Sequence, residues 1–220
     1  MDFSPPLGKH RGGKMVFSSP IRDFAFVAID FESAGAASGR TDVPIQIGMA
    51  GWAPDAGIGP SFVSYLRATH GIAWSAQKIH GITLDDLRDA PDLLALWPVV
   101  KEHLRDRVVV AHGKGTEKKF LRAFPGHGFG PWLDTLLLAR STWPQWQDHS
   151  LGGICDALEL TSHVRQACPD RQWHDALFDA TASLLLLEKI LQLTQSWQAP
   201  LAHFLQPDQS AWHRYQASKR

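Results

Sequence analysis

Two acidic residues near the start of the chain have the type and spacing of metal ligands. Asp30 ends the apolar stretch "FAFVAID" and Glu32 follows two residues later, so both side chains project from the same face of a strand. Neighbouring carboxylates repel one another unless a cation lies between them, and their hard oxygen atoms suit Mg²⁺ or Mn²⁺. Acidic pairs at strand ends are also common in solvated loops, so this pair alone is weak support for a metal site.

A histidine and an aspartate near the other end of the chain form a second candidate group. The stretch "QWHDALFDATASLLLL" places His174 just before a long helical pattern and Asp179 inside it. Aspartate has a poor helix propensity, so solvent or function must explain Asp179, whereas Asp175 lies where the helix dipole favours an acid. Viewed alone, His174 is best interpreted as an ordinary residue at the helix boundary.

The stretch "RVVVAHGKGTEKKFLRAF", residues 107–124, looks like a phosphate-binding loop but fails on spacing. A P-loop needs G-x-x-x-x-G-K-[ST], so that backbone amides can wrap the phosphates. Here the position of the first glycine falls inside the apparent strand, and Lys114 is followed by Gly115 rather than by a hydroxyl residue. We instead expect a strand, a turn and a helix that begins at Glu117, with Thr116 as its N-cap.

The elements that must position these residues alternate between strand and helix patterns. The sequence predicts three strands joined by short connections, then a helix that Pro98 kinks or splits, a strand and a helix. A short apolar run that fits either type follows, and then two further helices. In order, these segments are residues 24–30, 43–53, 61–68, 92–106, 107–112, 116–124, 131–140, 150–160 and 175–195. This order indicates an α/β fold in which helices cover both faces of a mixed sheet.

Length and composition favour one globular domain with short tails. We expect residues 1–22 to form a flexible leader, residues 23–197 the domain, and residues 198–220 a tail with a short helix. The formal net charge is zero, so a polyanionic partner must be held by a small basic surface or by metal ions. The nine tryptophans suit base stacking or, more commonly, core packing.

Cysteine usage and hydropathy predict the compartment. Cys155 and Cys168 are too few for a disulfide framework and lack a metal-type C-x-x-C spacing. No apolar run approaches the length of a membrane span. The sequence therefore predicts a cytoplasmic protein without a membrane partner.

Three stretches in this order, "AIDFES", "AHGKGTEKKFL" and "HDALFDA", resemble the motifs of the DEDDh branch of the DEDD superfamily of 3′-5′ exonucleases, to which proofreading exonucleases belong. The first motif of the family is an acid-x-Glu pair on a strand, matched by Asp30 and Glu32. The third is a histidine and an aspartate separated by four residues, matched by His174 and Asp179. Any one motif is weakly specific, but several in the right order are a strong sign of the family.

The resemblance extends to segments between the motifs and covers about residues 24–190. "IHGIT" at 79–83, "LDTLLLAR" at 133–140 and "HSLGGICDALEL" at 149–160 look like the connecting segments of the family. The resemblance implies a ribonuclease H-like fold, with a mixed five-stranded sheet and helices on both faces, for an exonuclease domain at residues 23–197.

The second motif is the most divergent. The family has an aspartate where this chain has Glu117, an asparagine at the position of Gly113 and a phenylalanine at the position of Thr116. Glutamate keeps the charge and the oxygen ligands but adds a methylene group. Glu117 also fits a helix N-terminal acid that is stabilised by the dipole, and both interpretations stay open at this point.

The first motif departs from the family in the residues after its glutamate. The family often has two threonines, a glycine and a leucine there, which hold the 3′-terminal nucleotide, whereas this chain has the small residues Ser33, Ala34, Gly35 and Ala36. The wedge against the last base is therefore weaker. By resemblance, the substrate-binding residues are Ser33, Ala34, Gly35, His112 and Lys114.

The activity implied by the resemblance is metal-dependent hydrolysis at the 3′ end of DNA or RNA, with a single-stranded end as partner and nucleoside 5′-monophosphates as products. Two Mg²⁺ or Mn²⁺ ions would be bound. Asp30 would bridge them, Glu32 and Asp179 would complete one site, and Glu117 would support the other. His174 would be the general base toward the attacking water. Two alternatives stay open: a catalytically weak or inactive module that binds nucleic acid or protein, and a phosphodiesterase for small nucleotides or very short RNA.

Overall fold

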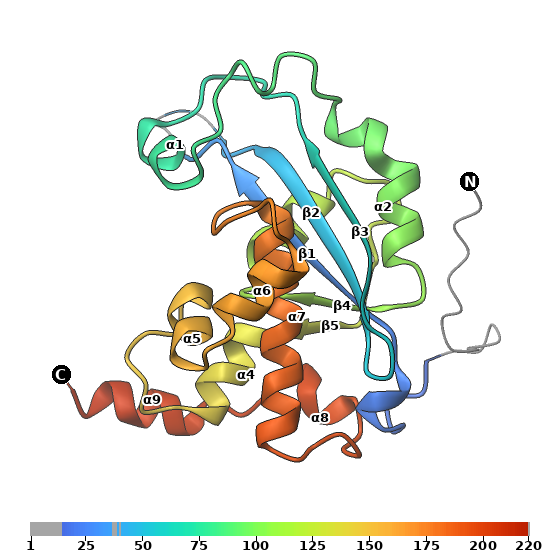
Figure 1. The fold of residues 1–220 in the computed structure, drawn as a ribbon, viewed down its shortest axis with the longest axis vertical. Coiled ribbons are helices and arrows are strands. Elements are labelled where there is room, and N and C mark those ends of the chain that lie inside the picture. Colours follow the sequence, from blue (N-terminus) through green and yellow to red (C-terminus); the bar gives the residue numbers. More distant parts are fainter. Residues whose placement is uncertain (1–14, 37–38, 40, 220) are drawn as a thin grey trace.

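A computed structural model describes residues 15–36, 39 and 41–219. Its centre is a five-stranded sheet in the order β3-β2-β1-β4-β5 (Figure 1). The strands are β1 (Phe26–Ser33), β2 (Pro44–Ala53), β3 (Gly57–Tyr65), β4 (Val108–Ala111) and β5 (Trp132–Asp134). The first three form an antiparallel meander, while β4 pairs in parallel with both β1 and β5. The predicted mixed five-stranded sheet is confirmed.

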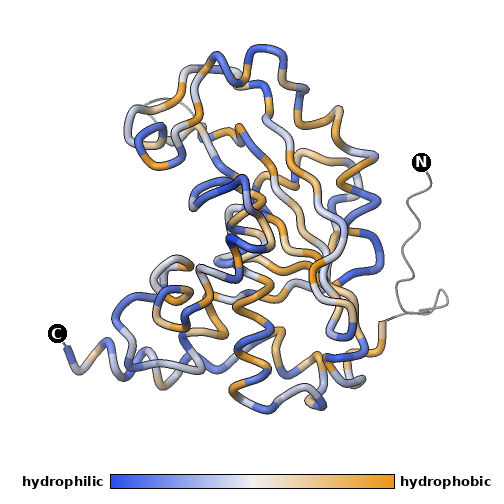
Figure 2. The backbone as a smooth tube through the Cα atoms, viewed as in Figure 1, coloured by the Kyte–Doolittle hydropathy of each residue, from blue (hydrophilic) through white to orange (hydrophobic). Residues whose placement is uncertain are grey.

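Helices cover both faces of this sheet, as predicted (Figure 1). One face packs against α4 (Thr135–Thr142), α5 (Leu151–Ala157), α6 (Thr161–Ala167) and the long α7 (Ala176–Leu193). The other face packs against α2 (Trp97–Leu104) and α3 (Gly115–Leu121). Hydrophobic residues are concentrated along the central strands and α7 (Figure 2).

The period of two along β1 assigns its side chains to the two cores. Phe26 and Ala28 belong to the core under α7, whereas Val27 and Ile29 belong to the core under α2 and α3. Asp30 continues the first series, so it lies on the face that α7 covers.

A glycine allows α7 to begin close to the sheet. Gly48 on β2 is the register partner of Asp30, and a Cβ atom on Gly48 would lie 2.2 Å from the backbone of Ala176 and Leu177. No other residue fits this approach, because a contact under about 3 Å requires the backbone to move. The first turn of α7 is therefore held beside the carboxyl end of β1.

The starts of two helices answer questions that the sequence left open. The pattern at 92–106 is split into a 3-10 helix, η2 (Leu93–Leu96), and α2, with Pro98 in the first turn of α2, where its missing N–H costs no hydrogen bond. The ambiguous run at 131–140 contains both β5 and the start of α4, and Asp134, the last residue of β5, caps α4.

The predicted start of α3 is wrong. The helix begins at Gly115, its N-cap is Lys114, and no side chain caps it, so Thr116 is not the N-cap. The backbone N–H groups of Gly113 and Lys114 instead donate to the carboxylate of Asp134. Asp134, about twenty positions later along the chain, thus holds the turn that leads into α3.

Two short helices were not predicted and two more lie in the tail. The unexpected ones are α1 (Trp74–His80) and α6, and the tail contains α8 (Ala202–Leu205) and α9 (Ser210–Ala217). Leu201 and Phe204 are buried in the core. Among the described residues, no helix combines the length and apolar character needed to span a membrane.

The described part of the predicted leader contacts the folded body. Ile21 is fully buried in the core under α7, and Pro20 forms an isolated bridge with Pro200. Residues 1–14 of the leader lie outside the described residues, and the domain boundaries stay predictions.

Candidate active site

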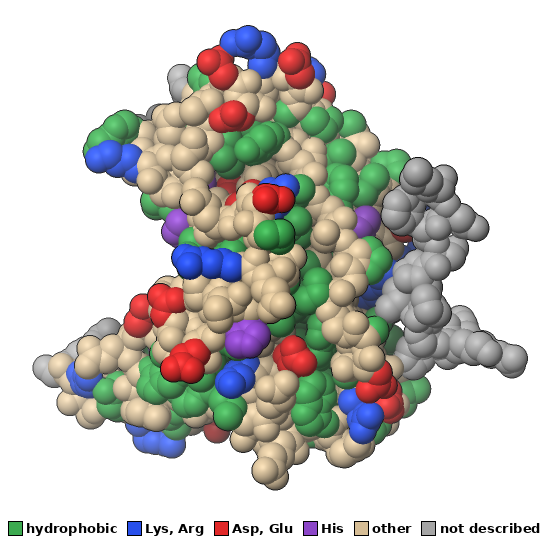
Figure 3. Space-filling model, in the orientation of Figure 1, with side chains coloured by type: hydrophobic (Ala, Val, Ile, Leu, Met, Phe, Trp, Pro, Cys, Tyr) green, Lys and Arg blue, Asp and Glu red, His purple; other side chains and the backbone are tan. Residues whose placement is uncertain are grey.

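Two of the sequence motifs meet at the carboxyl end of β1. Glu32 on β1, Asp179 in the first turns of α7 and His174 in the loop before α7 each offer a ligand atom, and these atoms all lie within 4.8 Å of one another. The molecule is hollowed on the side where β1 ends, between the end that carries α1 and the end that carries α5 and α9 (Figure 3). Residues far apart in the chain thus form one group that can hold a cation.

The acids in this group repel one another. Burial, followed by the charges of Asp179, Glu117, Glu32 and Asp175, raises the pKa of Asp30 well above its ordinary value. Burial and the charges of Asp179 and Asp175 raise the pKa of Glu32 to about 8. This electrostatic pattern is that of carboxylates arranged around a position for a positive ion.

One oxygen atom of the Asp179 carboxylate has no hydrogen-bond donor among the described residues and is available to bind a metal ion. Burial raises its pKa to about 7, an effect that a hydrogen bond from the His174 backbone N–H partly offsets and the charge of Asp175 reinforces. Its Oδ1 atom is buried and has no hydrogen-bond partner among the described residues. A buried carboxylate oxygen without a donor is costly unless a cation binds it.

Glu117 is close enough to Asp30 to act on its charge. It lies in the first turn of α3, is 5% exposed, and its charge contributes to the raised pKa of Asp30. Burial raises the pKa of Glu117 to about 7, although its own backbone N–H partly offsets this, and its Oε2 atom is buried without a partner in the described chain. Glu117 is not one of the three residues within 4.8 Å, so it lies further out.

These pKa shifts predict that the metal-free protein becomes more stable as the pH falls from about 8.5 to about 6.5. The folded state holds protons on Glu32, Glu117 and Asp179 more tightly than the unfolded chain does, so protonation in this window relieves the repulsion. Above this window the carboxylates are ionised in the folded state and repel one another fully. Bound Mn²⁺ should then stabilise the protein, as protons do at lower pH. Thermal unfolding measured at both pH values, with and without Mn²⁺, checks this.

Potassium chloride at equal ionic strength is the control for the added Mn²⁺. We expect Mn²⁺ to raise the Tm by several degrees at the higher pH and by less at the lower pH, because protons compete for the same oxygens. A Tm that falls with decreasing pH in this window, or that Mn²⁺ leaves unchanged, would contradict the arrangement.

The loop that carries His174 is held by a hydrogen-bond network that sequence reasoning missed. Gln46 on β2 donates from Nε2 to Asp175 Oδ2 at 2.9 Å, and its Oε1 accepts from the backbone N–H of Ala176 at 2.9 Å. Arg171 also donates to Asp175 Oδ2, at 2.6 Å, while Asp175 caps α7. His174 itself is exposed, with a left-handed backbone (φ 66°). The signal in the sequence is a polar residue inside the apolar strand "PIQIGMA".

Replacing Gln46 by Leu should therefore lower kcat by about tenfold or more, because a small displacement of a positioned catalytic group is costly. The change removes both hydrogen bonds, leaves the N–H of Ala176 without its acceptor, and leaves Asp175 held only by Arg171 and the first turn of α7. Nuclease assays well below the Tm of each variant measure the effect. Gln192→Leu, at an exposed position on α7, is the matched control. An unchanged kcat for the Gln46 variant would show that the loop holds His174 without this network.

A pocket of about 210 Å³ opens beside His174. Its lining includes Tyr65 and His80, neither of which the sequence singled out as a site residue, although "IHGIT" contains the histidine. Burial lowers the pKa of His80, a hydrogen bond with the Ser33 backbone opposes this shift, and the proximity of His174 adds to it. The pocket thus presents polar groups next to the acids.

The residues predicted to bind substrate after Glu32 lie at the base of α1. Ser33 donates its hydroxyl to Asp42 at 2.9 Å, and the carbonyl of Ala34 accepts from the N–H of Ala73 at 2.7 Å. Gly35 has φ 81°, and a Cβ atom there would lie 3.0 Å from that of Ala76. The small residues therefore allow α1 to pack against the end of β1.

His112 and Lys114 have structural contacts at the end of β4. The Nδ1 atom of His112 lies 3.1 Å from Thr135 Oγ1 and its Nε2 atom lies 2.9 Å from the carbonyl of His149, so both ring nitrogens are engaged. Lys114 begins α3 and donates its N–H to Asp134. Contact of these two residues with a substrate stays a prediction.

Comparison with known proteins gives one family. Residues 27–187 match the model of a protein family described as exonucleases. The chain is 30% identical over 138 residues to the PolC-type DNA polymerase III of Bacillus cereus, a region that is 60% of this chain and 9% of the polymerase. For the same polymerase of Bacillus subtilis the identity is 31% over 123 residues, which is 52% of this chain and 8% of the polymerase. The chain thus spans about a tenth of the length of these relatives.

Solved structures share the fold. Exonuclease X in complex with 5′-overhanging duplex DNA aligns with a TM-score of 0.65 and 23% identity, over 82% of this chain and 99% of that chain. The nuclease domain of 3′hExo, a DEDDh family member, bound to rAMP, aligns with a TM-score of 0.63 and 15% identity, over 80% of this chain and 94% of that chain.

Proposed function

This chain belongs to the exonuclease family, and we propose that it hydrolyses phosphodiester bonds at the 3′ end of DNA or RNA, releasing nucleoside 5′-monophosphates. The observation that carries this proposal is the convergence of Glu32, His174 and Asp179 within 4.8 Å, beside the strongly perturbed carboxyl of Asp30. Carboxylates and a histidine in such a group suit metal-assisted hydrolysis.

The donor set fits divalent metal ions, and we propose Mg²⁺ or Mn²⁺, two ions per site. Asp30 would bridge them, Glu32 and Asp179 would complete one site, and Glu117 would support the other. The buried, unpartnered oxygens of Asp179 and Glu117 support this assignment. When bound, such ions stabilise the charge on the attacking and leaving oxygens of an in-line displacement.

The protein residues would position the substrate and move a proton. His174, exposed at the mouth of the group, would accept a proton from the attacking water. The pocket of about 210 Å³ beside it would hold part of the terminal nucleotide. Ser33, Ala34 and Gly35, next to the acids in the chain, would contact the same nucleotide, and His112 and Lys114 the strand beyond it. The predicted cytoplasmic location remains part of the proposal, as does a single-stranded end as partner.

The test is digestion of single-stranded DNA and RNA labelled at the 5′ end, with Mg²⁺ or Mn²⁺ present. We expect a ladder that shortens from the 3′ end and the appearance of nucleoside 5′-monophosphates. Cleavage of a dinucleotide in preference to a long strand would instead identify a phosphodiesterase for small nucleotides. Binding without metal-dependent turnover on any of these substrates would contradict the enzymatic proposal.

Glu117→Gln should lower kcat by about tenfold to a hundredfold and raise the Mn²⁺ concentration needed for half-maximal activity. The amide keeps the size of the buried side chain but loses the charge that faces Asp30. Activity assays across a Mn²⁺ titration measure both effects. Glu102→Gln, an exposed glutamate on α2, is the matched control. Equal metal requirements for the Glu117 variant and the wild type would assign Glu117 to helix stabilisation alone.

A further inference from the structure

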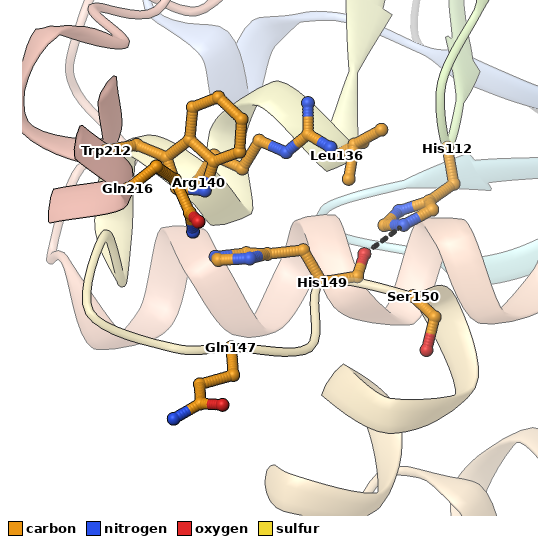
Figure 4. A pocket seen from close by; sticks show the side chains of 8 residues that line it. All are labelled: His112, Leu136, Arg140, Gln147, His149, Ser150, Trp212 and Gln216. Carbon is orange, nitrogen blue, oxygen red and sulfur yellow. Dashed lines mark hydrogen bonds between the residues drawn. The ribbon is translucent and has the colours of Figure 1, made fainter. Parts of the chain in front are cut away.

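A second pocket, of about 410 Å³, lies away from the acids, between α4, the loop before α5, and α9. It is lined by His112, Leu136, Arg140, Gln147, His149, Ser150, Trp212 and Gln216. Figure 4 shows Arg140 and Trp212 on one side of it and His112 and Ser150 on the other, with the ring of His149 between them. The lining is rich in hydrogen-bond donors.

The guanidinium of Arg140 has no acidic partner within the part of the chain that the structure describes. Its Cζ atom lies 4.4 Å from the centroid of the Trp212 ring, so the cation is stacked on an aromatic face. The Nε atom of Arg140 and the Nε1 atom of Trp212 are both buried without acceptors among the described residues. A half-buried cation and two unpaired donors in one pocket favour an anionic ligand with several oxygens.

The carboxylates nearest to this pocket are engaged elsewhere. Asp134 accepts from the backbone N–H groups of Gly113 and Lys114 and caps α4, and Asp148 accepts from the N–H of Ser150 at 2.7 Å. His149 uses Nε2 to contact the carbonyl of Trp143 at 3.1 Å. The positive charge of Arg140 is therefore left for a ligand.

One wall of the pocket lies outside the region that matches the family. Trp212 and Gln216 belong to α9, beyond residue 187, where the family match ends. Gln209, just before α9, donates to the carbonyl of Leu137 at 2.8 Å and fastens this segment to α4. The tail of this particular chain thus completes the pocket.

The pocket and the acids share one edge of the sheet. Strands β1, β4 and β5 are parallel, so their carboxyl ends meet at the same edge. Glu32 lies at the end of β1, His112 follows β4, and Leu136 follows β5. Neighbouring strands are about 4.8 Å apart, and β1 runs several residues beyond the level at which β4 and β5 end, so the ends of β1 and β5 are separated by roughly 15 Å. A strand whose 3′ end reaches the acids can continue past the pocket within a few nucleotides.

We propose that this pocket binds a backbone phosphate of the nucleic-acid strand upstream of its 3′-terminal nucleotide, with Arg140 as the cation that recognises it. The inference rests on the exonuclease function proposed above and names how that site holds its substrate. Arginine suits this role because its planar donors match phosphate oxygens while its face stacks on Trp212.

The test is binding of a 5′-fluorescein-labelled single-stranded DNA, about ten nucleotides long, measured by fluorescence anisotropy in EDTA-containing buffer. Arg140→Gln should weaken binding about tenfold, because it removes charge-assisted hydrogen bonds. The slope of log K against log salt should fall by about 0.7, the value for one phosphate contact on a single strand. A purely structural arginine would not change this slope.

Gln216→Glu covers the case in which the Arg140 variant does not fold. It keeps the stack of Arg140 on Trp212 and places a negative charge on the pocket wall, so it should also weaken binding severalfold. Arg214→Gln is the matched control, because Arg214 is exposed on α9 and does not line the pocket. Its affinity should stay within about twofold of the wild type.

The outcomes separate the possible sources of phosphate. If inorganic phosphate shifts the Trp212 indole N–H signal in NMR spectra but Arg140→Gln binds the oligonucleotide normally, the pocket takes free phosphate and the proposal is overturned. If inorganic phosphate does not shift the Trp212 signal and Arg140→Gln does not weaken oligonucleotide binding, the pocket residues serve only packing, and the proposal is also overturned. Because binding is measured without metal or turnover, an Arg140-dependent affinity in an inactive protein would contradict the proposed function and leave this inference standing.

Discussion

Replacing Asp30 by Asn should remove nuclease activity, by about 10³-fold or more, while making the metal-free protein more stable. The large effect on activity is expected because the amide cannot bridge two cations, and the charge stabilisation that they supply is worth several kcal/mol. The gain in stability follows from the environment of this carboxyl. Burial and four neighbouring acids raise the pKa of Asp30, so its charge opposes folding at neutral pH when no cation is bound.

Three measurements on the Asp30 variant test this reasoning. The variant should have a higher Tm than the wild type in EDTA, a smaller rise in Tm with Mn²⁺, and almost no release of mononucleotides. Asp55→Asn is the control, because Asp55 lies on the turn between β2 and β3 and its side chain is 85% exposed. A destabilised Asp30 variant that still responds fully to Mn²⁺ would show that Asp30 is not a metal ligand.

The sheet and the two outer motifs could be predicted from local patterns. The period of two places Asp30 and Glu32 on one face of β1, and the apolar periodicity of α7 fixes where His174 and Asp179 stand relative to its start. Motif order then indicated the family, which the match over residues 27–187 confirms. The positions on β1 and at the start of α7 could be inferred because they depend on residues within one element or directly beside it.

Features that depend on contacts between distant segments could not be predicted. Thr116 was assigned as an N-cap because local sequence cannot reveal that Asp134 supplies the acceptor for the preceding N–H groups. Gln46 is unremarkable in its own strand, and its role is visible only once α7 approaches Gly48. Likewise, α9 completes a pocket with residues that lie about seventy positions earlier.

The tryptophans illustrate the same limit. Trp143 and Trp146 stack on each other, with ring centroids 4.7 Å apart, and pack against the core under α7. Trp173, next to the candidate general base, meets Phe178 edge to face at 4.9 Å. For these three residues the structure supports core packing, the commoner of the two roles that the sequence left open.

His174→Asn should lower kcat by about 10²-fold to 10⁴-fold, the usual contribution of a general base, while metal binding persists. Asparagine is the appropriate replacement because His174 has a left-handed backbone, φ 66°, which asparagine tolerates better than most residues. The substitution therefore keeps the loop conformation, and a loss of activity can be attributed to removal of the imidazole. Glu32 and Asp179 remain in place, so Mn²⁺ should still raise the Tm.

The same variant separates two roles that geometry allows for His174. Its ring lies within 4.8 Å of ligand atoms of Glu32 and Asp179, so it has the position of a metal ligand as well as that of a base. If His174 were a ligand, the variant would lose most of the Mn²⁺-induced rise in Tm together with activity. If it is the base, kcat falls and the rise in Tm remains. His163→Asn, at an exposed position on α6, is the control and should change neither quantity. A His174→Asn variant that keeps its activity would show that another group accepts the proton from the attacking water.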